Sequence, residues 1–147
     1  MRNLKEFFLN ETSAWEGVTV LPHRFGGIEF RLGKAEIGHL HNNGLLDIPF
    51  PVKIKNQLVK EGLASPHHVL PDSGWISFYI KNETDIENAT RLLRLSYLRY
   101  ILSGKGLNEE FPDDLDYKDQ LAGLNLSPEL RSIVNDLADR NKYAINN

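Results

Sequence analysis

The chain has 147 residues, with 17 basic and 20 acidic side chains, 41% hydrophobic residues and no cysteine. This length fits one compact domain with a buried core. The missing cysteine excludes disulfides, thiolate metal sites and cysteine nucleophiles, and the formal net charge of -3 disfavours a general nucleic-acid-binding protein. Charged residues interrupt the first 15 positions, and no window resembles a secretory signal or a membrane span. We therefore expect a cytoplasmic protein with no membrane partner.

Hydrophobic periodicity predicts helices and strands in a mixed order. The expected helices cover 2–14, 51–61 and 84–102, and a last helix begins at Ser127-Pro128. The expected strands are 18–21, 28–32, 35–41, 45–50 and 75–80. Because no βαβ series appears, the order predicts an α+β fold: an antiparallel meander sheet packed by helices, with a long core helix over 84–102 and a C-terminal helical appendage. Thr84 and Glu87 have the spacing of a capping box at the start of the long helix.

Charge divides the chain at about Ser103-Gly104-Lys105-Gly106. Residues 1–103 carry 12 basic and 11 acidic side chains, whereas residues 104–147 carry 5 basic and 9 acidic ones. We therefore take 1–103 as the α+β core domain and 104–147 as an acidic linker plus a C-terminal helix. Acidic and aromatic residues are interleaved over 109–117, which suggests an extended piece that docks its rings on a partner. The apolar stripe of the last helix must be covered by the core or by a partner subunit, and so it is a candidate homodimer interface.

The hairpin around Gly33-Lys34 predicts which face of the sheet His39 and His41 occupy. A two-residue turn of type II′ pairs Arg31 with Glu36 as an ion pair and continues in register to pair Ile28 with His39. In that register both histidines share the apolar face of Ile28 and its alternate neighbours. They would then lie on or beside the buried side.

The next hairpin has two registers, and they differ in chemistry. A two-residue loop at Asn43-Gly44 places His39 opposite Ile48 and directs Asp47 to the other face. A three-residue loop at 42–44 places His39 opposite Asp47 and forms a His-His-Asp cluster. A slip of one residue reverses every side chain, so only one register can hold. We favour the two-residue loop because it separates polar from apolar residues cleanly.

Two histidine pairs are the candidate functional residues. His39 and His41 lie two apart on a strand and share a face, while His67 and His68 follow Pro66 in the irregular stretch 63–74. Since adjacent residues diverge, we expect at most one of the second pair to join the first. The metal candidates are His39, His41 and His68, with a divalent ion as cofactor, and Asp47 completes the catalytic candidates for acid–base chemistry. The ligand-binding candidates are Arg24, His39, His41, His67, His68 and Trp75.

Three functional interpretations stay open at this point. The first is a binding module for a small molecule or a protein, with histidines lining one sheet face. The second is a small enzyme, either metal-dependent or based on histidine acid–base chemistry, that uses His39 and His41 with Asp47 or His68. The third is a nucleic-acid-binding protein of double-wing-like fold, which the acidic balance disfavours. Histidines on an apolar face can also be purely structural residues, hydrogen-bonded to backbone.

Five ordered motifs carry a resemblance to a known family. They are Pro22–Phe30, Glu36–His41, Leu46–Pro51, His67–Trp75 and Leu92–Tyr97. Together they resemble the bacterial and fungal proteins labelled "luciferase family" or "luciferase domain", over about residues 17–103. The label does not imply light emission, and the resemblance supplies no catalytic residues. Residues 104–147 lie outside the pattern.

Overall fold

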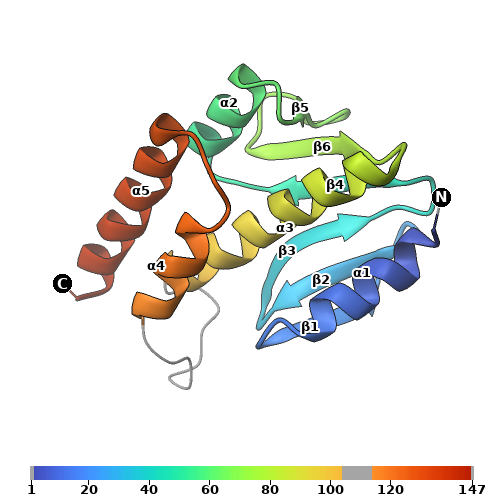
Figure 1. The fold of residues 1–147 in the computed structure, drawn as a ribbon, viewed down its shortest axis with the longest axis horizontal. Helices are drawn as coiled ribbons and strands as arrows, with labels where there is room; N and C mark the ends of the chain where they lie inside the picture. The colour runs from blue at the N-terminus through green and yellow to red at the C-terminus, as the bar shows by residue number, and fades with distance from the viewer. Residues whose placement is uncertain (1, 104–113, 147) are drawn as a thin grey trace.

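A computed structural model describes residues 2–103 and 114–146, and it confirms the α+β class (Figure 1). The strands are β1 (Val18–Pro22), β2 (Ile28–Leu32), β3 (Ala35–Leu40), β4 (Leu45–Pro49), β5 (Ser65–Pro66) and β6 (Trp75–Tyr79). The helices are α1 (Leu4–Ser13), α2 (Val52–Lys60), α3 (Glu83–Ser103), α4 (Asp114–Ala122) and α5 (Pro128–Asn146). The strands form one sheet in the order β1-β2-β3-β4-β6-β5, and every described pairing is antiparallel.

Helix α3 is the long core helix that the sequence predicts. It packs on β3 and β4, and its apolar side chains Leu93 and Leu98 are fully buried (Figure 1). Its start differs from the prediction, because the cap is Asn82 and not Thr84. The Asn82 side chain accepts the N–H of Asp85, and the Asp85 carboxylate accepts the N–H of Lys81. A cap related to the capping box therefore forms two residues earlier than Thr84 and Glu87 would place it, with Asp85 accepting the N–H of the residue before the cap and not that of the cap itself.

The β2–β3 hairpin begins as predicted and then slips by one residue. Its turn at Gly33 has a φ of 63°, and Arg31 lies opposite Glu36. Beyond that pair the register shifts, so that Glu29 faces His39 and Ile28 faces Leu40. The predicted pairing of Ile28 with His39 is therefore wrong. Because a one-residue shift reverses the faces, His39 lies on the face opposite the α3-covered core.

The shift is a β-bulge at Ile37 and Gly38, and helix α3 explains its position. Ser96 of α3 donates a hydrogen bond of 2.8 Å to the carbonyl of Ile37, and both residues are fully buried. A Cβ on Gly38 would lie 2.8 Å from Leu93 Cδ1, so the helix approaches the strand where it has no side chain. Ser96 thus satisfies a carbonyl that the bulge removes from regular strand pairing.

The β3–β4 hairpin uses the three-residue loop that we did not favour. His39 lies opposite Asp47 and Leu40 opposite Leu46, and the N–H of His41 bonds the carbonyl of Leu45. The objection to this register was that it would place Leu46 on the polar face. The bulge removes that objection. It places Leu40 on the core face, where Leu46 pairs with it, and His39 on the opposite face with Asp47.

The C-terminal segment packs on the core of its own chain. Ser127 caps α5 as predicted, accepting the N–H of Leu130, and Leu130 and Val134 are fully buried. Helix α5 contacts α2 and α3, and α4 contacts α3 (Figure 1). The expectation of an extended piece over 109–117 is wrong where it can be compared, because residues 114–117 begin α4 and Tyr117 is buried in the core cluster. Residues 104–113, which include the predicted junction and most of the acidic stretch, lie outside the described residues.

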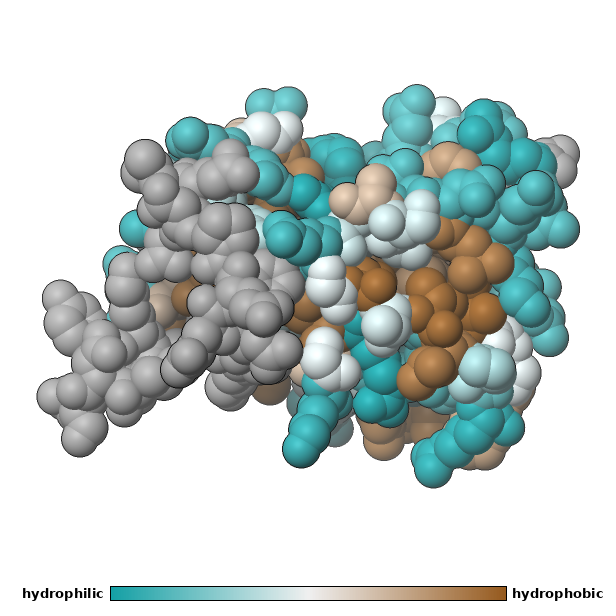
Figure 2. Space-filling model, turned by 90° about the horizontal axis from the view of Figure 1, so that it is seen from below, coloured by the Kyte–Doolittle hydropathy of each residue, from teal (hydrophilic) through white to brown (hydrophobic). Residues whose placement is uncertain are grey.

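The lower side of the molecule presents α1 and the open sheet edge β1. Figure 2 shows a group of hydrophobic residues on this side, bordered by hydrophilic ones. Leu9 of α1 and Leu21 of β1 belong to the exposed large hydrophobic residues. Pro22 ends β1, and since proline has no N–H it limits pairing at that edge. Along the described part of the chain, no helix has both the length and the apolar character needed to cross a membrane.

Candidate functional site

All five histidines of the chain line one cavity on the sheet face opposite α3. Three segments form it: the β1–β2 turn, strands β3 and β4 with the turn between them, and the loop from β5 into β6. We call it the histidine cavity; its volume is about 460 Å³. It is lined by His23, Arg24, Phe25, Glu36, His39, His41, Asp47, His67, His68, Val69, Leu70 and Trp75. Every candidate site residue from the sequence lies here, and His23 and Glu36 join them.

The loop 63–74 folds over the sheet and brings the second histidine pair to the first. Lys55 of α2, which is buried, donates a hydrogen bond of 2.8 Å to the carbonyl of Pro71. The N–H of His67 bonds the carbonyl of Trp75. These contacts fix the loop at both ends, so the histidines sit over Asp47 without belonging to a regular strand.

Asp47 is the centre of the cluster. Its Oδ2 lies 2.8 Å from Nε2 of His41, 3.2 Å from Nε2 of His39 and 3.4 Å from Nε2 of His67. Its Oδ1 accepts a hydrogen bond of 2.6 Å from Ser77, the residue opposite it on β6. Burial alone would raise the pKa of the Asp47 carboxyl, but hydrogen bonds from His39, Ser77 and His41 outweigh it and hold the pKa well below its usual range. Asp47 is therefore an ionised carboxylate with no exposed surface.

His39 is held between two carboxylates. Its Nδ1 lies 3.0 Å from Oε1 of Glu36, and its Nε2 faces Asp47. Burial alone would lower the pKa of His39, but the hydrogen bonds to Asp47 and Glu36 outweigh it and raise the pKa to about 9. Without a metal, His39 is an imidazolium that donates from both nitrogens. The predicted ion pair of Arg31 with Glu36 does not form in this arrangement, because Arg31 bonds Glu29 instead.

His67 has one fixed tautomer. Its Nδ1 accepts the backbone N–H groups of Val69, at 3.1 Å, and Leu70, at 3.0 Å. A nitrogen that accepts hydrogen bonds carries no proton, so the proton of the neutral ring is on Nε2, which faces Asp47. Burial lowers the pKa of His67, which favours that neutral form.

Both members of the second pair reach Asp47, contrary to our expectation of one. His68 Nδ1 lies 3.3 Å from Ser77 Oγ and 3.9 Å from Asp47 Oδ1. The rings of His67 and His68 stack, with centroids 4.4 Å apart and planes at 28°. Adjacent side chains diverge in an extended strand, but this loop is not extended at that point, and so the rule does not apply.

His23 and Glu36 are the ionisable cavity residues that were not site candidates from the sequence. The ring of His23 lies 4.1 Å from that of His39, and its Nδ1 is buried without a hydrogen-bond partner. Burial and the neighbouring His39 lower the pKa of His23, so its ring is neutral. The sequence made the neighbouring Arg24 a ligand-binding candidate but not His23. The signal that could have found His23 is its position. It directly follows β1, and β1 pairs with β2, which lies beside the strand that carries His39.

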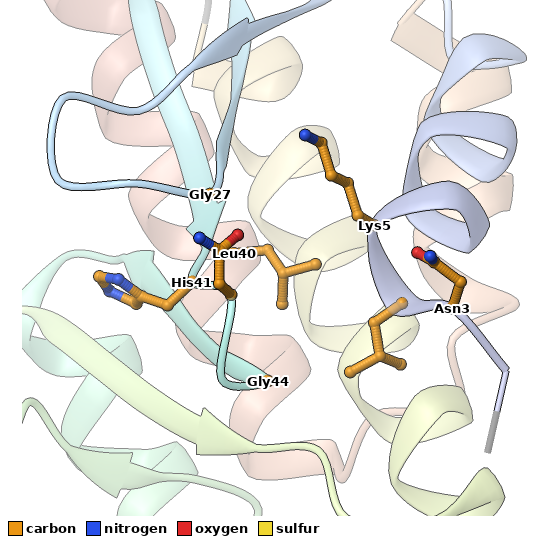
Figure 3. Close-up of a pocket in the computed structure, with 8 residues that line it drawn as sticks. Asn3, Lys5, Gly27, Leu40, His41 and Gly44 are labelled. Carbon is orange, nitrogen blue, oxygen red and sulfur yellow. The ribbon is translucent and has the colours of Figure 1, made fainter.

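A second cavity of about 370 Å³ lies next to the first, between the start of α1 and the turn after β3. Figure 3 shows Asn3 and Lys5 across from Gly27, Leu40 and Gly44, with the imidazole of His41 pointing away from α1. The ring of His41 therefore serves the histidine cavity, where its Nε2 bonds Asp47. Among the described residues, Nδ1 of His41 has no protein partner.

Three sets of these side chains could hold a metal ion. They are His39-His41-Asp47, Asp47-His67-His68 and His23-Glu36-His39, each with its ligand atoms within 4.8 Å of one another. The first set is the His-His-Asp cluster that the three-residue loop predicts. It contains two metal candidates from the sequence, and the third, His68, belongs to the second set.

Comparison with known proteins supports a family resemblance over the same segment. Residues 34–96 match the family model described as "Luciferase domain". This confirms the predicted resemblance within 17–103, and the matched segment includes Glu36, Asp47, Trp75 and both histidine pairs. His23 and Arg24 lie outside it. Neither the comparison with curated proteins nor the one with solved structures gives a match.

Proposed function

We propose that the protein binds a divalent transition-metal ion through Nε2 of His39, Nε2 of His41 and Oδ2 of Asp47, and that the ion acts on a small molecule in the histidine cavity. One observation carries this: both Nε2 atoms converge on a single carboxylate oxygen, at 3.2 and 2.8 Å. Ligands about 2.0–2.2 Å from an ion, at tetrahedral or right angles, are about 2.8–3.6 Å from each other. Both N–O distances lie within that range.

The surrounding residues support the same assignment. A histidine that ligates a metal through one nitrogen almost always donates the other N–H to a carboxylate, a backbone carbonyl or water, and Oε1 of Glu36 lies 3.0 Å from Nδ1 of His39. Ser77 holds Oδ1 of Asp47, which leaves Oδ2 for the ion. Two imidazoles and one carboxylate suit Zn²⁺ or Fe²⁺, and they leave coordination positions open for a water or a substrate.

A second candidate function needs no metal. His41 Nε2 donates to Asp47, and its Nδ1 is without a protein partner in the described part of the chain. A buried carboxylate that orients a histidine whose other nitrogen is free is the arrangement of a general base. This interpretation predicts a folded, functional protein that contains no bound ion.

Metal analysis of the full chain, purified without a histidine tag, tests the metal proposal. We expect about one zinc or iron ion per chain, and stoichiometric zinc uptake by protein first treated with a chelator. His39→Ala, His41→Ala and Asp47→Ala should each weaken zinc binding by more than about 100-fold, and Glu36→Gln by about 10- to 100-fold.

His68→Ala is the matched control, because His68 belongs to the same cavity but not to the proposed ligand set. It should keep zinc affinity within a few-fold, and circular dichroism should confirm that every variant is folded. A folded wild-type chain that binds no zinc or iron would refute the metal proposal and favour the acid–base one. An equal loss in His68→Ala and His39→Ala would refute this particular ligand set.

A further inference from the structure

The tautomer of His67 makes it a donor to whatever binds at the proposed ion. Since Nδ1 accepts two backbone N–H groups, from Val69 and Leu70, the ring cannot offer a lone pair at Nε2 while it stays neutral. Its Nε2 lies 3.4 Å from Oδ2 of Asp47, one of the proposed ligand atoms. His67 is therefore not a ligand of the ion. It presents an N–H beside the carboxylate oxygen that would hold the ion, where a group bound to that ion could accept it.

The mouth of the histidine cavity is lined by apolar side chains, whereas its floor is polar. Phe25, Val69 and Leu70 line the cavity although they are 73%, 67% and 51% exposed. Large apolar side chains this exposed indicate a surface that another apolar group covers. Because all three border one opening above a polar floor, the cavity fits a molecule with a polar head and an apolar body.

Charge identifies the head as an anion. Arg24 stands at the mouth, with its guanidinium carbon 4.6 Å from the centroid of the Phe25 ring. On the floor, Glu36 is bonded by His39 and Asp47 by its histidines and Ser77. The ion and Arg24 together outweigh these two carboxylates, so the loaded cavity attracts negative charge.

We propose that the site takes a small carboxylate with an apolar chain, whose carboxylate binds the ion and accepts the His67 Nε2–H while its chain lies on Phe25, Val69 and Leu70. This proposal rests on the metal-binding function above. The apolar side chains at the mouth require an apolar chain in the bound molecule. The ion and the His67 N–H require an anionic head that can accept a hydrogen bond. Acetate, hexanoate and decanoate are suitable probes because they share the head and differ only in the chain.

The test uses the full chain loaded with Co²⁺, whose visible absorption reports directly on ligands at the ion. We expect each carboxylate to shift the cobalt spectrum, with affinity rising from acetate to decanoate. Each methylene that becomes buried should improve affinity by about threefold to fourfold. Phe25→Ser should reduce the ratio of decanoate to acetate affinity, and His67→Gln should weaken both probes by a similar factor.

Tyr79→Ser is the matched control, because Tyr79 is 49% exposed but does not line the histidine cavity. It should leave cobalt uptake and both affinities unchanged. Equal affinities for acetate and decanoate, or an unchanged ratio in Phe25→Ser, would overturn the proposed apolar contact. Normal cobalt loading with no spectral response would overturn this inference and leave the metal site intact, whereas a chain that takes up no cobalt would contradict both.

Discussion

The two carboxylates around His39 should make the stability of the metal-free protein depend on pH. The neighbours that face His39 are Glu36 on its own strand, Asp47 on β4, His23 from the β1–β2 turn, His41, His67 and Trp75. Glu36 and Asp47 accept its protons and raise its pKa, while burial opposes them. His39→Gln removes the titrating ring and keeps an amide that can hydrogen-bond.

The direction in which stability changes with pH follows from the raised pKa of His39. The ordinary pKa of histidine is 6.5, and in the folded protein that of His39 is about 9. A raised pKa stabilises the fold fully below 6.5, and this contribution disappears as pH rises through about 9. It amounts to about 3 kcal/mol at pH 6, about 2 kcal/mol at pH 7.5 and less than about 0.5 kcal/mol at pH 9.

Urea denaturation in the presence of a chelator measures this contribution. The free energy of unfolding of wild type minus that of His39→Gln should fall by about 2–3 kcal/mol between pH 6 and pH 9. Other titrating groups largely cancel in that difference. A difference that stays constant over this range would refute the doubly hydrogen-bonded imidazolium. With zinc present the trend should reverse, because the ion must displace the Nε2 proton and therefore stabilises the fold more at high pH.

Three further predictions test how the fold supports the site. Ser96→Ala leaves the buried carbonyl of Ile37 unsatisfied and should cost about 1–3 kcal/mol in urea denaturation; Thr90→Ala, whose hydroxyl bonds a carbonyl of its own helix, is the control and should cost less than about 0.5 kcal/mol. Asn82→Ala removes the cap of α3 and should lower the free energy of unfolding by about 1 kcal/mol, whereas no effect would contradict the observed cap. Lys55→Met breaks the bond to the carbonyl of Pro71 and should speed hydrogen exchange at Val69 and Leu70, with unchanged exchange arguing against its role in fixing the loop.

Most of the secondary structure could be predicted from the sequence, because the signals for it are local. Alternating apolar and charged residues over 28–32 gave a strand, Gly33-Lys34 a tight turn, and the apolar run with its capping residues the long helix. The cap moved by two residues because Asn82-Glu83-Thr84-Asp85 contains a second box of equal chemistry. The two histidine pairs also indicated where the candidate site lies, because both pairs line the same cavity.

Packing between distant segments sets the face of the sheet on which the candidate site lies and the residues that complete it. The bulge at Ile37 and Gly38 depends on Ser96 and Leu93, more than 50 positions later in the chain, and no local pattern reports their approach. That single shift moved His39 from the core side to the face of Asp47. His23 lines the histidine cavity because β1 pairs with β2, which places the turn between them on the same face as His39. The register of a sheet depends on packing between distant segments. The His-His-Asp cluster forms in only one register, and so its formation depends on that packing.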